Sequence, residues 1–366
     1  AVGVALELAR MSPPLEVDLA FAAPSPSPSP TPSPSPSPSY DDLRRAFDAV
    51  KDVGVFGALK RKERTVAVAT AAGLRCAHTS ASVQLEAIAQ IDDGSAWAGH
   101  YAPADQPVDI TDVVARAADA ARRSRNPVTI DPGPRDVVLA PAAVAELLEW
   151  MALASFGARS VIDGQSLLGG RAGELICSPR VTIAEATPPG ELPFDAEGVR
   201  RQAVDFIRDG RAGHAVSDLV SAARLADGRG STGHAAPISQ QNEATTPTPA
   251  HVVLAPGAHT EDELIAMVER GIYVTRLHYV NGLLDTRRAT MTGMTRNGTF
   301  TIEDGRLGRA AVNLRFTDSI LDALSEERLG GIGRTLRATP TWWSAAGQTE
   351  APALLLRRFQ WSGASR

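Results

Sequence analysis

A long run of alternating apolar and polar residues fills positions 64–102, and two short turn signals are its only interruptions. The run reads RTVAVATAAGLRCAHTSASVQLEAIAQIDDGSAWAGHYA, with the turn signals at AAG and DDG. A period of two is typical of strands that bury one face, and short turns containing Gly join such strands in antiparallel order. The run therefore predicts an antiparallel strand meander, which argues against a regular alternation of strands and helices.

Helix and strand signals follow one another irregularly in the rest of the sequence. They include a capping box, in which Thr260 stands three residues before Glu263, and hairpin turns at Asp209-Gly210 and Asp304-Gly305. Helices are predicted over 41–53, 108–125, 142–156, 259–271 and 315–327, and strands over 136–141, 180–186, 251–257, 271–280, 289–316 and 353–363. This order predicts an α+β chain.

Two stretches rich in proline divide the chain. Residues 24–39 alternate Pro with Ser or Thr, and this repeat forms neither helix nor sheet interior because every second residue lacks a backbone donor. The segment NPVTIDPGPR at 126–135 is the second boundary. We therefore expect a disordered segment over 1–40, an N-terminal α+β domain over 41–132 and a C-terminal domain over 133–366.

Charge and composition exclude several classes of protein. The formal net charge is -5 and the pI is near 5.9, which argues against a broad electrostatic grip on nucleic acid. There is no run of about 18 apolar residues, and the opening segment lacks the features of a signal peptide. Cys76 and Cys177 belong to no paired motif and are typical of thiols in a reducing compartment. We expect a cytoplasmic protein with no nucleic-acid or membrane partner.

Eight phrases, taken in order across residues 64–366, resemble the TldD/PmbA (TldE) family of metallopeptidases. The phrases are DVVLAPAAVAELL, GRAGELI, FDAEGVRRQAV, STGHA, HVVLAPG, GIYVTRLHYV, GTFTIEDGRL and NLRFTDSILDAL. The resemblance implies a mixed α/β N-terminal domain followed by a larger β-rich domain of barrel or sandwich type. It also implies a longer N-terminal domain than this chain has before its meander.

The family contains a catalytic and a non-catalytic type, which pair as a heterodimer. The catalytic type holds zinc with an HExxxH helix and a cysteine near the C-terminus. When GRAGELI is taken as the anchor, Glu149 and Ala154 stand at the two histidine positions and Trp150 at the general-base position. An anchor on Gly347-Gln348 places the cysteine position near Trp343. Neither Ala nor Trp can perform those roles.

The resemblance therefore implies a TldE-like chain with no metal of its own, and zinc is expected only in a partner chain. No His lies between His100 and His214, and no Cys follows Cys177, so a small error of alignment does not restore the motif. Glu149 is interpreted either as a remnant facing the former cleft or as a carboxylate on the helix surface. Trp150 is interpreted as a core residue.

Two groups of residues are candidates for substrate binding. In STGHA, the Gly-His turn is suited to hydrogen-bonding a peptide backbone through His234, with Ser231 and Thr232 as further donors. Arg276 and Asp285 flank a segment that the family places near its cleft. The alternatives are a buried structural histidine in the first group and a solvated loop in the second.

The function that these features predict is a non-catalytic subunit of a two-chain zinc peptidase. It would pair with a TldD-like chain and form a cleft for extended peptides, while hydrolysis takes place in the partner. Two alternatives remain open at this stage. One is a stand-alone, metal-free enzyme that acts on a peptide-like metabolite, and the other is a non-enzymatic binding protein that forms homo-oligomers.

Overall fold

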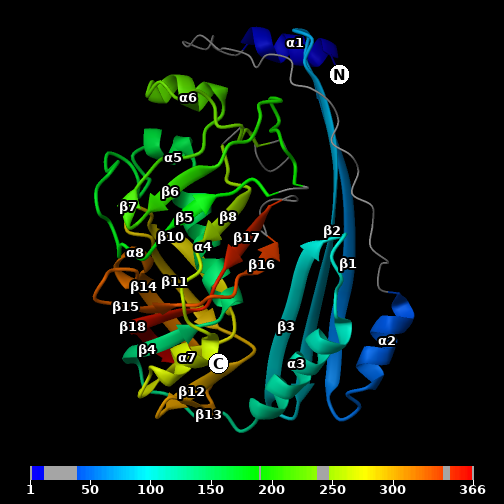
Figure 1. The fold of residues 1–366 in the computed structure, drawn as a ribbon, viewed down its shortest axis with the longest axis vertical. Coiled ribbons are helices and arrows are strands. Elements are labelled where there is room, and N and C mark those ends of the chain that lie inside the picture. Colours follow the sequence, from blue (N-terminus) through cyan, green and yellow to red (C-terminus); the bar gives the residue numbers. More distant parts are fainter. Residues whose placement is uncertain (1, 12–38, 189–190, 237–246, 341–346, 365–366) are drawn as a thin grey trace.

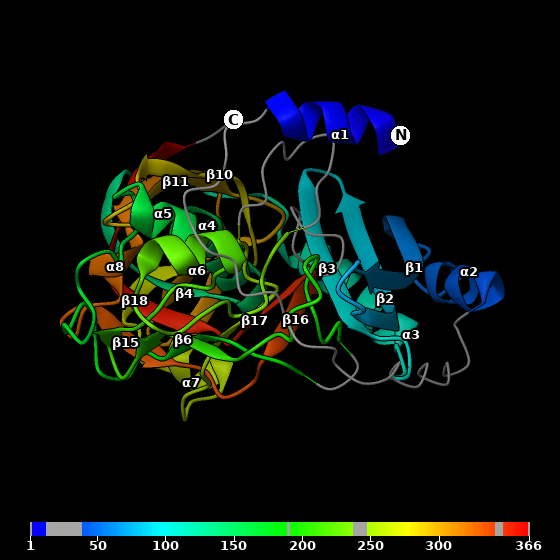
Figure 2. The ribbon, with the colours of Figure 1, turned by 90° about the horizontal axis from the view of Figure 1, so that it is seen from above.

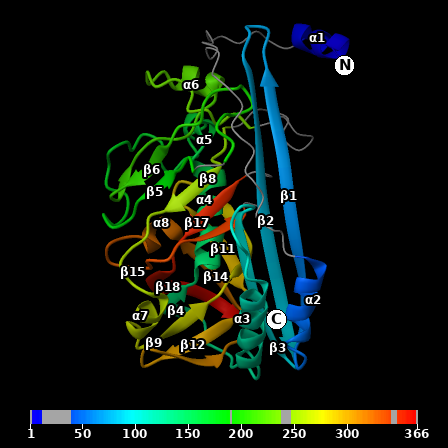
Figure 3. The same cartoon turned by 45° about the vertical axis from the view of Figure 1, so that its right-hand side comes forward.

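The predicted meander is a three-stranded antiparallel sheet in the computed structural model of the chain, which describes residues 2–11, 39–188, 191–236, 247–340 and 347–364 (Figure 1). Its strands are β1 (Gly54–Ala69), β2 (Arg75–Ile91) and β3 (Gly94–Pro103), paired in that order. β1 and β2 stay in register over their whole paired length. Together they form a hairpin that runs along most of the long axis of the molecule (Figure 3).

One helix covers the meander and gives this part of the chain its core. α3 (Ile110–Arg123) starts at Asp109, whose side chain accepts a hydrogen bond from the Asp112 backbone N–H. Its alanine- and valine-rich face packs on β2 and β3, and the shorter α2 (Tyr40–Asp48) lies against α3. α1 (Val2–Met11) falls within the segment expected to be disordered, whereas positions 24–38 of the Pro/Ser repeat lie outside the described residues.

The remainder of the chain forms two large sheets that stand beside the meander (Figure 2). The first sheet has the order β10-β11-β14-β18-β4-β9-β12-β13, with β15 also paired to β18, and the second has the order β16-β17-β8-β5-β6-β7. The strands of the first sheet are β4 (Gly133–Leu139), β9 (Arg270–Val274), β10 (Leu277–Asp285), β11 (Thr290–Thr295), β12 (Thr299–Glu303), β13 (Arg306–Ala310), β14 (Leu314–Ser319), β15 (Leu329–Ile332) and β18 (Leu354–Ala364). Those of the second are β5 (Ile183–Glu185), β6 (Val204–Arg208), β7 (Arg211–Ala212), β8 (His251–Leu254), β16 (Arg337–Pro340) and β17 (Gln348–Ala351).

A single helix, α4 (Pro141–Ser155), lies between these two sheets. It packs on β10 of the first sheet and on β17 and β8 of the second, within the largest apolar core of the molecule. A helix enclosed on nearly all sides has to be apolar on nearly all sides, which explains why its sequence shows so few polar residues. The smaller helices are α5 (Ala158–Ile162), α6 (Leu219–Leu225), α7 (Glu261–Ala266) and α8 (Ile320–Ala323).

Local sequence signals identified most of these elements, and the α+β prediction is confirmed. The helix predicted over 315–327 is wrong in its first part, because Leu314–Ser319 form β14 and the helix α8 covers only Ile320–Ala323. Asp209 and Gly210 have φ values of 49° and 74°, and Asp304 and Gly305 have 49° and 72°, as tight hairpin turns require. The capping box of Thr260 and Glu263 is present at the start of α7. α4 ends at Ser155, and Gly157 stands at the N-cap position of α5. Among the helices that the structure describes, none has both the length and the apolar character needed to cross a bilayer.

Candidate functional site

A cleft separates the meander from the six-stranded sheet. Its larger part has a volume of about 560 Å³ and lies where β16 runs beside β3 (Figure 1). β16 is the edge strand of its sheet, and within the described residues it pairs only with β17. The lining residues are Ala81, Gly99, His100, Tyr101, Pro103, Asp105, Gln106, Pro188, Glu191, Leu336, Arg337, Ala338, Gln348 and Glu350.

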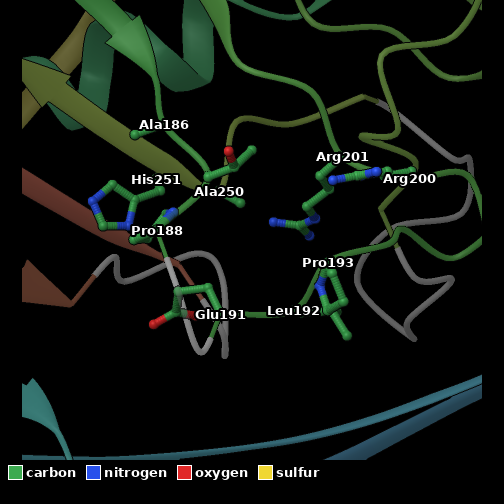
Figure 4. A pocket seen from close by; sticks show the side chains of 10 residues that line it. Ala186, Pro188, Glu191, Leu192, Pro193, Arg200, Arg201, Ala250 and His251 are labelled. Carbon is green, nitrogen blue, oxygen red and sulfur yellow. The ribbon is translucent and has the colours of Figure 1, made fainter. Parts of the chain in front are cut away.

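A smaller cavity of about 140 Å³ adjoins the cleft and shares Pro188 and Glu191 with it. His251 and Glu191 lie on one side of this cavity, and Arg200 and Arg201 lie on the other (Figure 4). Burial raises the pKa of Glu191 above its usual value, and electrostatic interactions with His251, Arg201 and His78 oppose that rise. The cavity is therefore a polar recess whose walls carry charges of both signs.

A hydrogen-bonded group of three side chains connects the two cavities. His251 Nε2 lies 2.9 Å from Glu350 Oε1, and Gln348 Nε2 donates to the same oxygen at 3.1 Å. The hydrogen bond with His251 holds the pKa of Glu350 below its usual value, against the opposing effect of burial. His251 starts β8 and the other two residues lie on β17, so the parallel pairing of these strands brings them together.

Glu185 fixes the backbone that carries His251. Its Oε1 accepts hydrogen bonds from the backbone N–H groups of Ala250 at 3.0 Å and His251 at 2.9 Å. His234 Nε2 lies 3.1 Å from the same oxygen, but its N–H direction is unsuitable for a hydrogen bond, so we regard the pair as a close polar contact. Because Glu185 and His234 are each 1% exposed, this arrangement supports the cavity wall from behind.

Asp195 organises the opposite wall. Its carboxylate accepts hydrogen bonds from the backbone N–H groups of Glu197, Val199 and Ala235 at 2.8–2.9 Å. Burial nevertheless raises the pKa of Asp195, and the three backbone donors oppose that rise. The loop held in this way leads into Arg201, whose backbone N–H donates to Pro193 O at 2.9 Å.

The structure brings together the three candidates of the STGHA segment. Thr232 Oγ1 lies 3.0 Å from His234 Nδ1, and Thr232 Oγ1 and Ser231 Oγ each donate to the carbonyl of Ser217, at 3.1 and 3.2 Å. The His234 side chain is buried and does not line the cavity. It contacts Glu185, which in turn holds the backbone of His251 in the cavity wall. The arrangement matches the alternative of a buried structural histidine.

Arg276 and Asp285 lie apart from this group. Arg276 sits over the indole ring of Trp97 from β3, at 4.9 Å from its central carbon to the ring centroid, and so joins the meander to the rest of the molecule. Asp285 is exposed at the end of β10, where its side chain accepts hydrogen bonds from the backbone N–H groups of Arg287 and Arg288. Neither residue lines the two cavities described above.

The window of α4 that the resemblance aligns with the zinc motif lies inside the core. Glu149 is 2% exposed, so its interpretation as a helix-surface carboxylate is wrong. Its Oε1 has no hydrogen-bond partner among the described residues, and burial, together with the nearby Glu146, raises the pKa of Glu149 to about 9. Trp150 packs closely against Gly282 of β10, and Ala154 is buried. Trp343 lies outside the described residues.

These residues do not fit a zinc ion. A protein zinc site takes three or four nitrogen, sulfur or oxygen ligands, and Glu149 offers the only candidate ligand in the window. Across the described ranges, no group of three or more His, Cys, Asp or Glu side chains is arranged to hold a metal ion.

Comparison with known proteins identifies the family. The family model described as the PmbA/TldA metallopeptidase C-terminal domain matches residues 132–363, which is more than half of the chain. The chain belongs to this family. The match covers both large sheets and α4, and it confirms the resemblance drawn from the sequence.

Two curated proteins are similar in sequence to part of this chain. A protein named "Metalloprotease" from Methanothermobacter thermautotrophicus is 25% identical over 192 residues, which are 52% of this chain and 40% of that protein. An uncharacterized protein from Methanocaldococcus jannaschii is 30% identical over 134 residues, which are 35% and 31% of the two chains. The matched region thus spans less than half of the length of either relative.

Solved structures share the fold over most of the chain. TldE from Thermococcus kodakarensis is similar with a TM-score of 0.80 and 19% identity, over 99% of this chain and 84% of that one. A putative modulator of a DNA gyrase from Thermotoga maritima gives a TM-score of 0.79 with 18% identity, over 97% and 82%. At these identities the similarity establishes the fold alone.

Sequence reasoning missed most residues that line or support the two cavities. Arg201 lies in FDAEGVRRQAV and His251 in HVVLAPG, phrases that carry the family resemblance, yet neither residue was a candidate. Glu185, Glu191, Asp195, Gln348 and Glu350 were also absent from the candidates. A charged residue within an otherwise apolar strand, as in RVTIAEA, was the signal available for Glu185.

Proposed function

We propose that the chain is a TldE-like, non-catalytic subunit, which pairs with a TldD-like catalytic chain and contributes a peptide-binding cleft. The observation that carries this proposal is the composition of the α4 window, where Glu149, Trp150 and Ala154 stand at the positions of the zinc motif. Because Glu149 is a buried acid whose raised pKa favours the neutral form, it is poorly suited to serve even as a single ligand. Zinc and the hydrolytic step therefore belong to the partner chain.

The shape of the cleft supports the peptide-binding part of the proposal. An extended peptide binds a sheet by pairing with an open strand edge, and β16 presents such an edge toward β3. The cleft beside it, at about 560 Å³, has room for several residues of an extended chain. Tyr101 and Arg337 line it from opposite sides and offer one aromatic and one cationic contact. Its substrate would be a peptide or peptide-like molecule.

Two further properties belong to this proposal. The partner is a TldD-like chain, with self-association as the alternative, and nucleic acid and membranes are not partners. The compartment is the cytoplasm, where free thiols such as Cys76 and Cys177 persist.

The proposal is tested by reconstitution with a TldD-like chain from the same genome. Each chain is purified without chelator and without a His-tag, and zinc per chain is measured by elemental analysis. We expect less than about 0.1 equivalent in this chain and about one in the partner. Gel filtration of the mixture should show a heteromeric complex, and hydrolysis of an unstructured peptide should require the partner.

Other outcomes favour the alternatives. About one zinc per copy of this chain would contradict the proposal, since ligands from elsewhere would then have to replace the α4 window. A stable homodimer that ignores the TldD-like chain would indicate a binding protein. Turnover of a peptide-like compound by this chain alone, with no zinc, would indicate a separate enzyme.

A further inference from the structure

The smaller cavity contains a guanidinium, that of Arg201, which interacts electrostatically with Glu185, Asp195 and Glu191 but makes no hydrogen bond within the described part of the chain. Arg201 is partly buried, and its Nε atom is fully buried without a hydrogen-bond partner in the described part of the chain. Its guanidinium makes no hydrogen bond and no ion pair with any described side chain or carbonyl. A desolvated guanidinium without an acceptor is costly, and most buried charges in proteins are paired.

We propose that this cavity receives a carboxylate group of the bound peptide and that Arg201 is the residue that recognises it. The proposal rests on the proposed peptide-binding function and adds a substrate preference to it. The carboxylate has two possible sources in a peptide, the C-terminus and an Asp or Glu side chain. Both place two oxygens in the planar arrangement that a guanidinium binds with two hydrogen bonds.

The neighbouring acidic residues do not take the place of such a ligand. The carboxylates of Glu185 and Asp195 accept hydrogen bonds from backbone N–H groups. They act on Arg201 electrostatically, without a hydrogen bond or ion pair to it among the described residues. Glu191 lines the same cavity, on the side away from Arg200 and Arg201, and makes no hydrogen bond or ion pair with Arg201 among the described residues (Figure 4). Arg200, which is exposed at the rim, adds a second positive charge.

The position and size of the cavity fit a terminal recognition pocket. It has a volume of about 140 Å³. One water molecule needs about 10–15 Å³, so the cavity is much larger than a single water site. A carboxylate and the carbon atoms next to it therefore fit. Because the cavity shares Pro188 and Glu191 with the larger cleft, a peptide lying along β16 can extend one carboxylate toward Arg201.

The supporting network keeps Arg201 at this position. Gly233 lies directly over its backbone, so that an added Cβ would stand 2.8 Å from the Arg201 nitrogen and 2.3 Å from the Arg200 carbonyl oxygen. The following residue, His234, contacts Glu185, which fixes His251 on the other side of the cavity. Both walls are thus held by one connected set of buried polar groups, and the recess is formed before a ligand arrives.

Binding of three fluorescein-labelled peptides to the full chain tests the proposal. All are eight-residue Ala/Ser peptides labelled at the N-terminus, one with a free C-terminal carboxylate, one with a C-terminal amide, and one with a C-terminal amide and an internal Glu. We expect the neutral amide to bind about 10- to 100-fold more weakly than at least one anionic peptide. The tighter anionic peptide identifies the source of the carboxylate.

The variant Arg201→Gln should abolish this preference, while Arg201→Lys should retain part of it. Arg224→Gln is the matched control, because it removes one exposed positive charge from α6 outside the cavity and should leave the preference unchanged. Circular dichroism checks that each variant folds, and the preference of the unaltered chain is measurable even if Arg201→Gln does not fold.

Three results would overturn the inference. The three peptides could bind equally, the preference could persist in Arg201→Gln, or no peptide could bind with the TldD-like chain either present or absent. Failure of the proposed function can be distinguished from failure of this inference, because pairing with the TldD-like chain and zinc content are measured in separate experiments. A chain that forms no heteromer yet prefers the anionic peptide would refute the pairing and retain the recognition of a carboxylate.

Discussion

The guanidinium of Arg276 lies over the indole ring of Trp97, with 4.9 Å between its central carbon and the ring centroid. Trp97 is on β3 of the meander, and Arg276 directly precedes β10 in the C-terminal part. Near them, Asn297 Nδ2 donates to Ser95 Oγ at 2.6 Å, and the Trp97 backbone N–H donates to Asn297 O at 3.3 Å. These contacts join the meander to the nine-stranded sheet, so the placement of the meander on the rest of the molecule depends on them.

The first prediction concerns this contact. Trp97→Ala should lower the free energy of unfolding by about 2 kcal/mol, because it removes a large contact surface and the cation–π interaction. Trp97→Phe should lower it by less than about 1 kcal/mol, since an aromatic face remains for Arg276. Urea unfolding followed by circular dichroism gives both values.

A double-mutant cycle with Arg276→Met separates the pairwise interaction from other effects of each change. We expect a coupling of about 0.5–1 kcal/mol between Trp97→Ala and Arg276→Met. Arg306→Met is the control, because this arginine is exposed on β13 and should show no coupling. A coupling near zero for Arg276 would mean that the stacked geometry contributes nothing to the joining of the domains.

The second prediction concerns the buried acid of α4. The pKa of Glu149 is about 9 in the folded chain and 4.5 ordinarily, so between these values the folded state holds a proton that the unfolded state releases. The contribution of the protonated Glu149 carboxyl to the free energy of unfolding is complete below pH 4.5 and is lost as the pH rises toward 9. Glu149→Gln carries no titrating group, so its stability relative to the unaltered chain should rise by on the order of 2–4 kcal/mol between pH 5 and pH 8.

Thermal or urea unfolding at several pH values measures this effect. Glu303→Gln is the matched control, because it makes the same replacement at an exposed position on β12. If the stability difference for Glu149→Gln were constant from pH 5 to pH 8, the carboxyl would be ionised in the folded chain. The argument against its role as a metal ligand would then fail.

Sequence patterns were sufficient for features that depend on neighbouring residues. The alternation at 64–102 and the Asp-Gly pairs fixed strands and turns because period-two burial and positive φ are local requirements. The same local reading misjudged Glu149, because the burial of α4 on nearly every side is imposed by two sheets that form from distant segments.

The cavity walls could not be predicted in this way. His251, Glu185 and Gln348 meet because β17, β8 and β5 are adjacent in the sheet, although they are far apart in the sequence. Strand order depends on long-range packing, and a single sequence carries little information about it. The candidates that came from the sequence were instead those in one short segment, Ser231, Thr232 and His234, which local contacts bring together.

The third prediction concerns Gly233. Its φ is +76°, and an added Cβ would stand 2.3 Å from the carbonyl oxygen of Arg200. Gly233→Ala should therefore destabilise the chain by about 2–4 kcal/mol, since a backbone clash is added to the left-handed strain. Gly230→Ala is the matched control, because its φ is +72° and nothing lies within 4 Å of the added Cβ.

The free energy of unfolding of Gly230→Ala should fall by only about 1 kcal/mol, which is the cost of placing Ala in the left-handed conformation. Urea unfolding gives both free energies, and the difference between them measures the clash with the backbone of Arg200 and Arg201. Equal losses in the two variants would mean that the loop moves away from Arg200 at little cost. The cavity wall would then be less rigid than the contacts of Gly233 imply.

The last prediction concerns Glu350, which joins the cleft to the cavity through His251. The hydrogen bond with His251 lowers the pKa of Glu350 below its ordinary value of 4.5. A lowered pKa contributes stability above pH 4.5, and this contribution is lost as pH falls through the folded-state pKa. Glu350→Gln should therefore cost about 1 kcal/mol at pH 7 and less at pH 3.

Urea unfolding at the two pH values measures this difference, with Glu303→Gln again as the control for the loss of a carboxylate.

The variant Glu350→Gln also distinguishes two interpretations of the hydrogen-bonded group formed by His251, Gln348 and Glu350. If His251 and Glu350 only stabilise the junction of β8 and β17, peptide affinity should follow the loss of stability and recover at low temperature. If Glu350 also orients His251 toward a bound peptide, affinity should fall by several-fold at temperatures where the variant is fully folded. A cost at pH 3 equal to that at pH 7 would show that the carboxylate charge contributes nothing.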